Sequence, residues 1–407
     1  MRQSILYDCF MTSMAGKAKV LPVRNRRDRK DFFQLPFVLY RNDTHWIPPV
    51  GDSIERELDP ARNPYFAHSE REMFVARRGE AAVGRIVAVE NYAYNERHRQ
   101  RIAFFSHFEC EDDPAAGTAL FDAVRAWAKA RNLEAIRGPL APGLHGPCGI
   151  LLEGHELPPP ILTPWNPPYY RRLLEAAGLQ KTKDSLAYRF TRESAANANL
   201  MRLDRLRGAA ARRLSGLRLR ALDAAGFTRD AAAIWALFEE TRRDNRGTVP
   251  MSEAEIRHAI ATFRNIADPR LVIMAEADCG PVGYVAALPD SGPALRRIRG
   301  RLWPFGWLTL ALEQRRAAGM RVFGLGVLPR FRGSGVTAAL LAEILRRGLD
   351  AGYSWAEASW IVEDNLPPRR LIEKTMKTQA CRKYGEYEEV FSSSRYGARC
   401  RRSESAA

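Results

Sequence analysis

The sequence predicts an α/β protein of the α+β type, built from two tandem modules that each contain a mixed β-sheet flanked by helices. Apolar strand patterns alternate with amphipathic helix patterns along the chain, and the same order of elements occurs twice. A short motif also stands at the same place in both copies. A length of 407 residues with 46% apolar side chains is sufficient for two such modules, each with its own core.

The first module is expected over residues 21–191. It begins with a hairpin that turns at Arg78-Gly79-Glu80, and its short last helix ends at Gly178, because glycine adopts the backbone conformations that turns and helix ends require. The order is two hairpin strands, a strand, an amphipathic helix, a strand, a short helix and a closing strand. These elements are expected at 72–77, 82–89, 102–108, 115–130, 134–140, 166–178 and 185–190.

The second module is expected over residues 246–391 and repeats this order. Its elements are expected at 271–277, 282–288, 322–327, 336–348, 355–361, 365–374 and 384–391. In both short helices an Asn and a Pro-Pro pair precede Arg-Arg-Leu, then Leu or Ile, then Glu. The shared order and motif indicate an internal duplication, and two unrelated α/β modules with common elements are the alternative.

The remaining segments are expected to connect or flank the modules. Residues 192–245 form the link, with an entry helix near 230–240. Residues 1–20 have the composition of a leader, and residues 392–407 that of a disordered tail.

The segment Gly326-Val-Leu-Pro-Arg-Phe-Arg-Gly-Ser-Gly-Val336 predicts an anion site. It leaves a strand, crosses a glycine-rich turn and enters a helix, whose N-terminus favours negative charge. The glycines allow successive N–H groups to converge, as a pyrophosphate cradle requires. The spacing matches neither a P-loop nor G-x-G-x-x-G, and an ordinary strand-to-helix turn is the alternative. The expected binding residues are Val327, Arg332, Gly333, Ser334, Gly335, Val336 and Thr337.

This segment resembles the signature of the GNAT superfamily of acyl-CoA-dependent acyltransferases, Arg/Gln-x-x-Gly-x-Gly/Ala after the fourth strand. Arg332, Gly335 and Thr337 occupy the signature positions, with Thr337 in place of the usual small residue. Asn365 matches the asparagine with which the family contacts the pantetheine arm. The resemblance therefore implies acyl-CoA as the co-substrate.

The resemblance also implies where the thioester lies. The family opens a gap between its fourth and fifth strands, which here are the strands at 322–327 and 355–361. The pantetheine arm threads this gap, and the fourth-strand backbone, here 325–328, polarises the thioester carbonyl.

Only the second module carries the cradle. The equivalent turn of the first module, Glu109 to Pro114, is acidic and would repel a pyrophosphate. The opening Tyr-Arg-Asn-Asp-x-x-Trp-x-Pro-Pro, at 40–49, resembles a group of bacterial two-module GNAT-like proteins linked to N-acylation of long-chain sphingoid bases. One acyl-CoA site is thus expected, beside a degenerate module.

Four residues are candidates for catalysis. Glu357, on the fifth strand near the gap, is the favoured general base, and a carboxylate paired with an arginine on the sheet is its alternative. The resemblance implies a thiolate-protonating Tyr where this chain has Ile372. Tyr384 and Tyr387 are nearby substitutes, with a place in the core as their alternative. His145 lies in a Gly/Pro-rich loop of the first module, where a surface histidine is the alternative.

Residues 297–313 form an apolar insertion flanked by arginines. It combines three arginines with two tryptophans, a phenylalanine and four leucines. Three interpretations stay open: a helix that covers the sheet, a wall for an acyl chain, and an interfacial helix on anionic lipid.

The charge distribution and the cysteine spacing bear on three features: nucleic-acid binding, disulfides and a metal site. The chain has 63 Lys and Arg against 47 Asp and Glu, a formal net charge of +16. The basic runs at 24–30 and 202–220 contain no aromatic residues that could stack on bases, so no nucleic-acid partner is expected. Six scattered cysteines without a C-x-x-C pair predict neither disulfides nor a metal site.

The sequence predicts a cytoplasmic protein that can associate peripherally with the inner membrane. It contains no spanning apolar stretch of about 18 residues and no secretory signal. The predicted function is transfer of an acyl group from acyl-CoA to an amine, most specifically from long-chain acyl-CoA to a sphingoid base. An N-acetyltransferase for a small-molecule or aminoacyl amine is one alternative. A CoA-binding, membrane-docking protein without turnover is the other, because the usual Tyr is missing.

Overall fold

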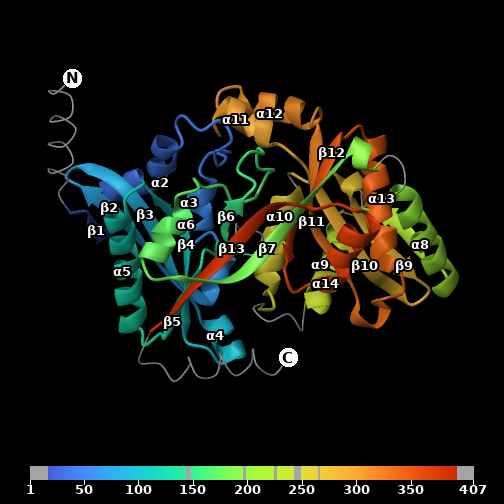
Figure 1. Ribbon diagram of the computed structural model, residues 1–407, viewed down its shortest axis with the longest axis horizontal. Helices are drawn as coiled ribbons and strands as arrows, with labels where there is room; N and C mark the ends of the chain where they lie inside the picture. The colour runs from blue at the N-terminus through green and yellow to red at the C-terminus, as the bar shows by residue number, and fades with distance from the viewer. Residues whose placement is uncertain are drawn as a thin grey trace.

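The computed structural model describes residues 17–143, 148–195, 199–223, 227–242, 249–264 and 266–391. Most of the expected leader, the whole expected tail and His145 lie outside these ranges. The strands form one mixed sheet with helices on both faces (Figure 1). The mixed α/β class predicted from the sequence is confirmed.

The sheet has 13 strands in the described chain, in the spatial order β1-β2-β3-β4-β5-β13-β7-β12-β11-β10-β9-β8, with β6 paired to β13. The strands are β1 (Lys19–Pro22), β2 (Ser69–Arg78), β3 (Ala81–Asn91), β4 (Ile102–Cys110), β5 (Ala135–Gly138), β6 (Ile150–Glu153), β7 (Gln180–Thr191), β8 (Arg218–Ala221), β9 (Val272–Ala277), β10 (Gly280–Pro289), β11 (Gly319–Val327), β12 (Trp355–Val362) and β13 (Ala380–Val390). The expected strands recur in this list within a few residues.

The helices of the described chain include those that the sequence predicts at 115–130, 166–178, 230–240, 336–348 and 365–374. They are α2 (Arg26–Leu39), α3 (Ser53–Glu57), α4 (Tyr92–His98), α5 (Pro114–Ala130), α6 (Tyr170–Ala176), α7 (Arg192–Ala195), α8 (Asn199–Arg213), α9 (Phe227–Arg242), α10 (Glu253–Arg264), α11 (Gly292–Ile298), α12 (Gly306–Gln314), α13 (Val336–Asp350) and α14 (Leu366–Arg370). Short 3-10 turns, η1 (Pro64–Ala67), η2 (Pro269–Leu271) and η3 (Pro329–Phe331), and a π-helical segment, η4 (Leu371–Thr375), complete the set.

Two apolar cores, one in each half of the sheet, follow from the periodicity of the helices that cover it. Leu120 and Val124 of α5 are fully buried against the N-terminal half. Leu340 and Ile344 of α13 are fully buried against the C-terminal half. Each such side chain contributes about 1.5–3 kcal/mol when it leaves water, so these two helices anchor their halves of the sheet.

The two halves exchange a strand at the centre of the sheet. β7 pairs with β12, which lies in the C-terminal half, and β13 pairs with β5, which lies in the N-terminal half. β7 and β13 also pair with each other along most of their length. The expectation that 185–190 closes its own module is therefore wrong, because this strand completes the other half and leaves no open edge between the halves.

The expected link is part of the C-terminal half. Within it, β8 pairs with β9 at the edge of the sheet, and α8 packs along α13. At the other end of the chain, Lys19 and Val20 belong to β1, which pairs with β2. The last residues of the segment expected to be a leader therefore belong to the sheet.

Strands β11 and β12 diverge, as the family resemblance implied. They pair in parallel only between Gly319–Val322 and Trp355–Ala358, although β11 runs to Val327 and β12 to Val362. On its other side β11 carries a bulge at Phe323, since Ala286 faces Gly324 while Ala287 faces Val322. The carboxyl ends of β11 and β12 therefore leave a gap in the sheet.

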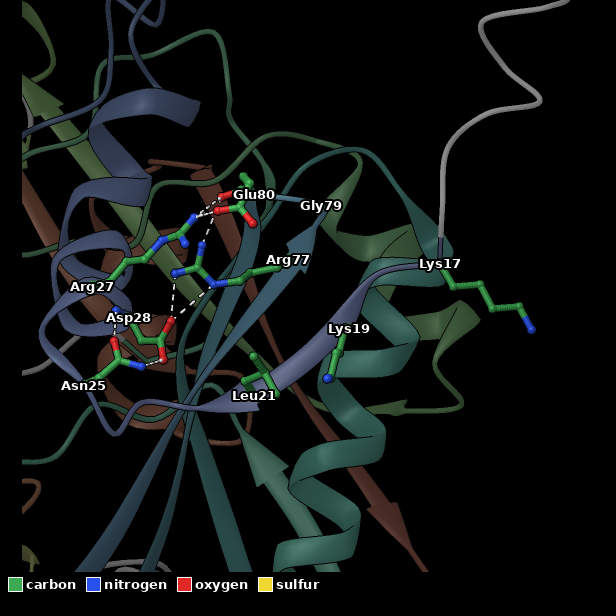
Figure 2. Close-up of a pocket in the computed structure, with 9 residues that line it drawn as sticks. All are labelled: Lys17, Lys19, Leu21, Asn25, Arg27, Asp28, Arg77, Gly79 and Glu80. Carbon is green, nitrogen blue, oxygen red and sulfur yellow. Dashed lines mark hydrogen bonds and ion pairs between the residues drawn. The ribbon is translucent and has the colours of Figure 1, made fainter.

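Three arginines of the basic run at 24–30 are paired with carboxylates. Arg24 pairs with Glu72 at 2.5 Å. Figure 2 shows the adjoining pocket, where Arg27 points to Glu80 and Arg77 to Asp28, the latter pair at 2.7 Å. This pocket lies beside β1 and β2, at the opposite end of the sheet from the gap. Arginines that are paired in this way do not form a phosphate-binding surface.

Candidate active site

The cradle lies between the end of β11 and the start of α13. Gly333 and Gly335 have φ values of 78° and 96°, which only glycine adopts without strain. Gly335 is the N-cap of α13 and supplies no side-chain cap. The N–H groups of the first turn have no partner inside a helix, and they carry the positive end of its dipole. This helix start is therefore suited to an anion such as pyrophosphate.

The side chains of the cradle hold its loop in place. Arg332 is exposed and donates a hydrogen bond of 3.1 Å to the carbonyl of Thr241 on α9. The Ser334 hydroxyl donates to the carbonyl of Phe331 at 2.6 Å. Val336 is buried and Thr337 is half-buried, so α13 is anchored at its first residue.

Gly335 has a second role that the sequence did not reveal. A Cβ at this position would lie 3.0 Å from Cβ of Ala210 and 3.2 Å from the carbonyl oxygen of Leu206, both on α8. At Gly333 a Cβ would meet nothing within 4 Å. Gly335 therefore also allows α8 to approach the start of α13 closely.

Asn365 lies beyond the divergent end of β12. It is exposed, it is the N-cap of α14, and its side chain makes no capping hydrogen bond. Its amide is therefore not engaged by the helix that it begins. The pantetheine contact that the resemblance implied for Asn365 stays a prediction.

Glu357 is fully buried and forms an ion pair. Its Oε2 lies 3.3 Å from Nε of Arg382, which is also fully buried. Burial raises the pKa of Glu357, and the positive charge of Arg382 opposes this shift. Its other oxygen, Oε1, has no hydrogen-bond partner within the described chain. Glu357 thus has the arginine partner of the alternative interpretation and one unengaged oxygen.

Two buried arginines fasten the loop at 154–162 across the centre of the sheet. Arg382 donates to the carbonyls of Gly154, Leu157 and Pro158 at 2.9, 3.0 and 2.7 Å. Arg321 of β11 donates to the carbonyl of Leu162 at 2.8 Å. The loop therefore belongs structurally to the gap region, although it comes from the first half of the chain.

Polar atoms without partners gather beside this loop. In the described residues, Trp360 Nε1, Tyr384 Oη and His155 Nε2 are buried and make no hydrogen bond. The Trp360 and Tyr384 rings lie 6.2 Å apart, and both pack in one apolar cluster with Trp165. The His155 ring lies 5.9 Å from that of Trp165. The structure thus brings together polar groups of β12, β13 and the loop.

Burial sets the protonation of these groups. It raises the pKa of Tyr384, so the phenol keeps its proton at neutral pH. It lowers the pKa of His155, so the imidazole is neutral there. The sequence pointed to Tyr384 by its position but not to Trp360, whose indole carries no sequence signal of a polar role.

The structure separates the other candidates from this cluster. Tyr387 packs in the core of the N-terminal half, where burial raises its pKa to about 12. Ile372, in the place of the usual Tyr, is buried in the core of the C-terminal half. His145, the remaining candidate, lies outside the described residues.

The N-terminal half has a buried polar network where the C-terminal half has its cradle and gap. Glu109 accepts hydrogen bonds from the hydroxyls of Tyr40 and Tyr170 at 2.6 and 2.7 Å. Close by, Oε1 of Glu57 lies 3.7 Å from Nε2 of His107. Burial raises the pKa of Glu57 to about 8 and lowers that of His107 to about 3. This half is thus filled by its own side chains.

We predict that Glu57→Gln stabilises the protein at alkaline pH. Because the folded pKa of Glu57, about 8, lies above its ordinary value of 4.5, the wild type loses stability as the pH rises between these values. Glutamine mimics the neutral acid and removes this loss, a gain of up to about 4 kcal/mol near pH 8 and below about 1 kcal/mol near pH 5. Urea unfolding of both proteins at the two pH values measures it, and an equal difference at both would contradict it.

The described ranges contain neither a cluster of metal ligands nor a membrane-spanning helix. No group of three or more His, Cys, Asp or Glu side chains there is arranged to hold a metal ion. Among the helices that the structure describes, none has the length and apolar character needed to cross a bilayer.

Known proteins match both the C-terminal half and most of the whole chain. The model of the Acetyltransferase (GNAT) family matches residues 232–377, which include the cradle and Asn365. The chain is 30% identical to the Bacterial ceramide synthase of Caulobacter vibrioides (strain NA1000 / CB15N) over 361 residues, 87% of this chain and 93% of that protein. It is 29% identical to Protein YghO of Escherichia coli (strain K12) over 392 residues, 93% and 97% of the two chains.

A solved structure supports the tandem fold. The alignment with the tandem GNAT protein from the clavulanic acid biosynthesis pathway covers 92% of this chain and 98% of that protein, with a TM-score of 0.52 at 12% identity. At this identity the match concerns the fold alone. The cradle, the gap between β11 and β12 and the relatives together identify the chain as a tandem member of the GNAT family of acyl-CoA-dependent N-acyltransferases.

Proposed function

We propose that this enzyme transfers a long-chain acyl group from acyl-CoA to the amine of a sphingoid base or a closely similar lipid. The observation that carries the proposal is the uncapped start of α13 beside the gap between β11 and β12. The similarity to Bacterial ceramide synthase over most of both chains supports the lipid acceptor.

The residues of the C-terminal half fit acyl-CoA. The N–H groups of Gly333 and of residues 335–337 would bind the pyrophosphate, with Arg332 fixing the loop and adding positive charge. Asn365 would hydrogen-bond the pantetheine arm as the arm enters the gap. The thioester would then lie beside the bulge at Phe323.

An apolar surface lies at the same place. Phe323 stacks on Phe263 with 5.1 Å between ring centres. Both pack in one cluster with Ile161, Ile298 and Leu310. Aliphatic and aromatic side chains at the bulge suit a long hydrocarbon chain better than the small polar acceptors of an acetyltransferase.

The chemistry requires two proton movements. The amine nitrogen attacks the thioester carbonyl carbon, the carbon–sulfur bond breaks, and the amide and CoA thiol form. We propose that Oε1 of Glu357 accepts the proton that the amine loses, because burial raises the pKa of this carboxylate and no described residue donates a hydrogen bond to that oxygen. Tyr384, protonated and without a hydrogen-bond partner in the described chain, would give its proton to the leaving thiolate.

The acyl-chain preference tests the function. Purified protein is incubated with acetyl-CoA or palmitoyl-CoA and sphinganine, and N-acylated product is measured by mass spectrometry together with thiol release. Palmitoyl-CoA is expected to react at least about tenfold faster, because each buried methylene contributes about 0.8 kcal/mol. Turnover with acetyl-CoA alone would favour the small-amine alternative. CoA binding without turnover on any amine would contradict an enzymatic role.

We predict that Tyr384→Phe lowers kcat by about a hundredfold and leaves KM unchanged, as the loss of a proton donor does. The fold is expected to be intact, since the hydroxyl has no hydrogen-bond partner among the described residues. Tyr387→Phe is the matched control: it also removes a buried hydroxyl without a partner in that part of the chain, but in the N-terminal core. Steady-state kinetics decide, and equal kcat in both variants would exclude Tyr384 as the donor.

A further inference from the structure

The insertion between β10 and β11 exposes large apolar side chains. The turn from α11 into α12, and α12 itself, present Trp303, Phe305, Trp307, Leu308 and Leu312 with exposed fractions of 84, 72, 55, 42 and 50%. We call these five residues the α12 patch. Figure 1 shows α11 and α12 at the upper edge of the molecule, apart from α8 and α13. Soluble proteins seldom expose so many large apolar side chains together unless the surface has a partner.

Arginines surround the α12 patch. Residues 297–316 contain five arginines and one glutamate, a net charge of +4. Arg297 pairs with that glutamate, Glu313, at 2.7 Å. The other four, Arg299, Arg301, Arg315 and Arg316, are exposed and form no ion pair with any described residue.

The inner side of the insertion reaches the proposed site. Leu310 of α12 and Ile298 of α11 belong to the apolar cluster that contains Phe323, the bulged residue beside the gap. One short insertion thus connects an exposed apolar surface to the place where the thioester would lie.

The positive charge around the α12 patch indicates what kind of partner the patch binds. A second copy of the chain, meeting the patch by two-fold symmetry, would bring two sets of four unpaired arginines together. An anionic bilayer has the opposite charge, and its headgroup region is where tryptophan side chains and basic flanks prefer to lie. Charge complementarity therefore favours lipid over a homodimer.

We propose that the α12 patch docks onto an anionic lipid bilayer and that the lipid acceptor passes from the bilayer beneath α12 to the gap at Phe323. Trp303, Phe305 and Trp307 enter the headgroup region, and the arginines contact lipid phosphates. The passage of the acceptor rests on the proposed function, whereas docking stands on the patch and its charge alone.

Vesicle co-sedimentation of the full chain tests docking. The vesicles are phosphatidylcholine alone, or phosphatidylcholine with a third replaced by phosphatidylglycerol. The wild type is expected to bind the anionic vesicles at least about tenfold more tightly, and added salt is expected to weaken this binding. Equal or absent binding to both kinds of vesicle would overturn the proposal.

Two double variants separate the contributions. Trp303→Ser with Trp307→Ser is expected to lower vesicle affinity at least about tenfold by removing apolar contact. Arg315→Gln with Arg316→Gln is expected to lower it about fivefold per arginine, and only on anionic vesicles. Val38→Ser, at an exposed apolar residue of α2, and Arg171→Gln, at an exposed arginine of α6, are the matched controls and are expected to change nothing.

Two further measurements keep docking distinct from the function. Light scattering is expected to give the same mass for the wild type and the tryptophan variant. A wild-type dimer that becomes a monomer in this variant would show that a second copy of the chain, and not lipid, covers the α12 patch. In detergent, the tryptophan variant is expected to acylate sphinganine at the rate of the wild type. With sphinganine in anionic vesicles, its rate is expected to fall below that of the wild type. Vesicle binding without any acylation would contradict the proposed function and support docking. Acylation without vesicle binding would support the proposed function and contradict docking.

Discussion

Thr337→Glu is expected to weaken acyl-CoA binding by about a hundredfold or more. Thr337 is the second residue of α13, within the first turn whose N–H groups would bind pyrophosphate. Two unit charges about 4 Å apart near a protein surface repel by about 4 kcal/mol, so a carboxylate there opposes the phosphates strongly. The same carboxylate stabilises the N-terminus of the helix, so the fold is not expected to suffer.

Calorimetric titration with CoA, together with the melting temperature, measures this effect. Thr337→Gln is the control, since it adds the same bulk without charge and is expected to bind within a fewfold of the wild type. A charge at Gly335 would be a poorer test, because its φ of 96° and the nearby Ala210 make any side chain disturb the fold. If a folded Thr337→Glu protein binds CoA as the wild type does, the cradle is not the pyrophosphate site.

Arg382→Met is expected to destabilise the protein by about 3–5 kcal/mol, the usual cost of leaving one partner of a buried ion pair alone. The variant leaves the Glu357 carboxylate without its partner in a fully buried position. It also removes every side-chain hydrogen bond from Arg382 to the loop at 154–162, namely those to Gly154, Leu157 and Pro158. Few single substitutions in this chain affect as many buried polar atoms.

Denaturant unfolding compares this variant with two others. Lys383→Met, next in the strand but partly exposed, is expected to change stability by less than about 0.5 kcal/mol. Adding Glu357→Gln to Arg382→Met is expected to recover part of the loss, because the buried charge is then removed. A loss below about 1 kcal/mol in the single variant would show that the pair and the loop contribute little.

The local pattern of the sequence was sufficient for the elements and for the cradle. The apolar spacing of Leu340, Leu341 and Ile344 predicts α13, and Gly333 and Gly335 before it predict a turn of positive φ, as the structure has it. Both signals are local, since helical periodicity and glycine conformation depend on a few neighbouring residues.

The pairing of strands and the buried arginines could not be predicted in the same way. Which strand lies beside β12 depends on a contact between residues nearly 170 positions apart, such as Glu357 and Arg189, and periodicity carries no record of it. Arg321 and Arg382 stand in strand patterns where an arginine normally indicates a surface position. Their burial follows from the loop at 154–162, whose carbonyls accept their hydrogen bonds.

The exchange of β7 and β13 determines whether either half of this chain can fold alone. A fragment ending at residue 191 would lack β13 beside β5 and would carry β7 without β12. Neither half of the chain is therefore an independent folding unit. Changes in one half thus act directly on the strand pairing of the other. The half that carries the cradle depends on the N-terminal segment of the chain for β7, a central strand of the sheet.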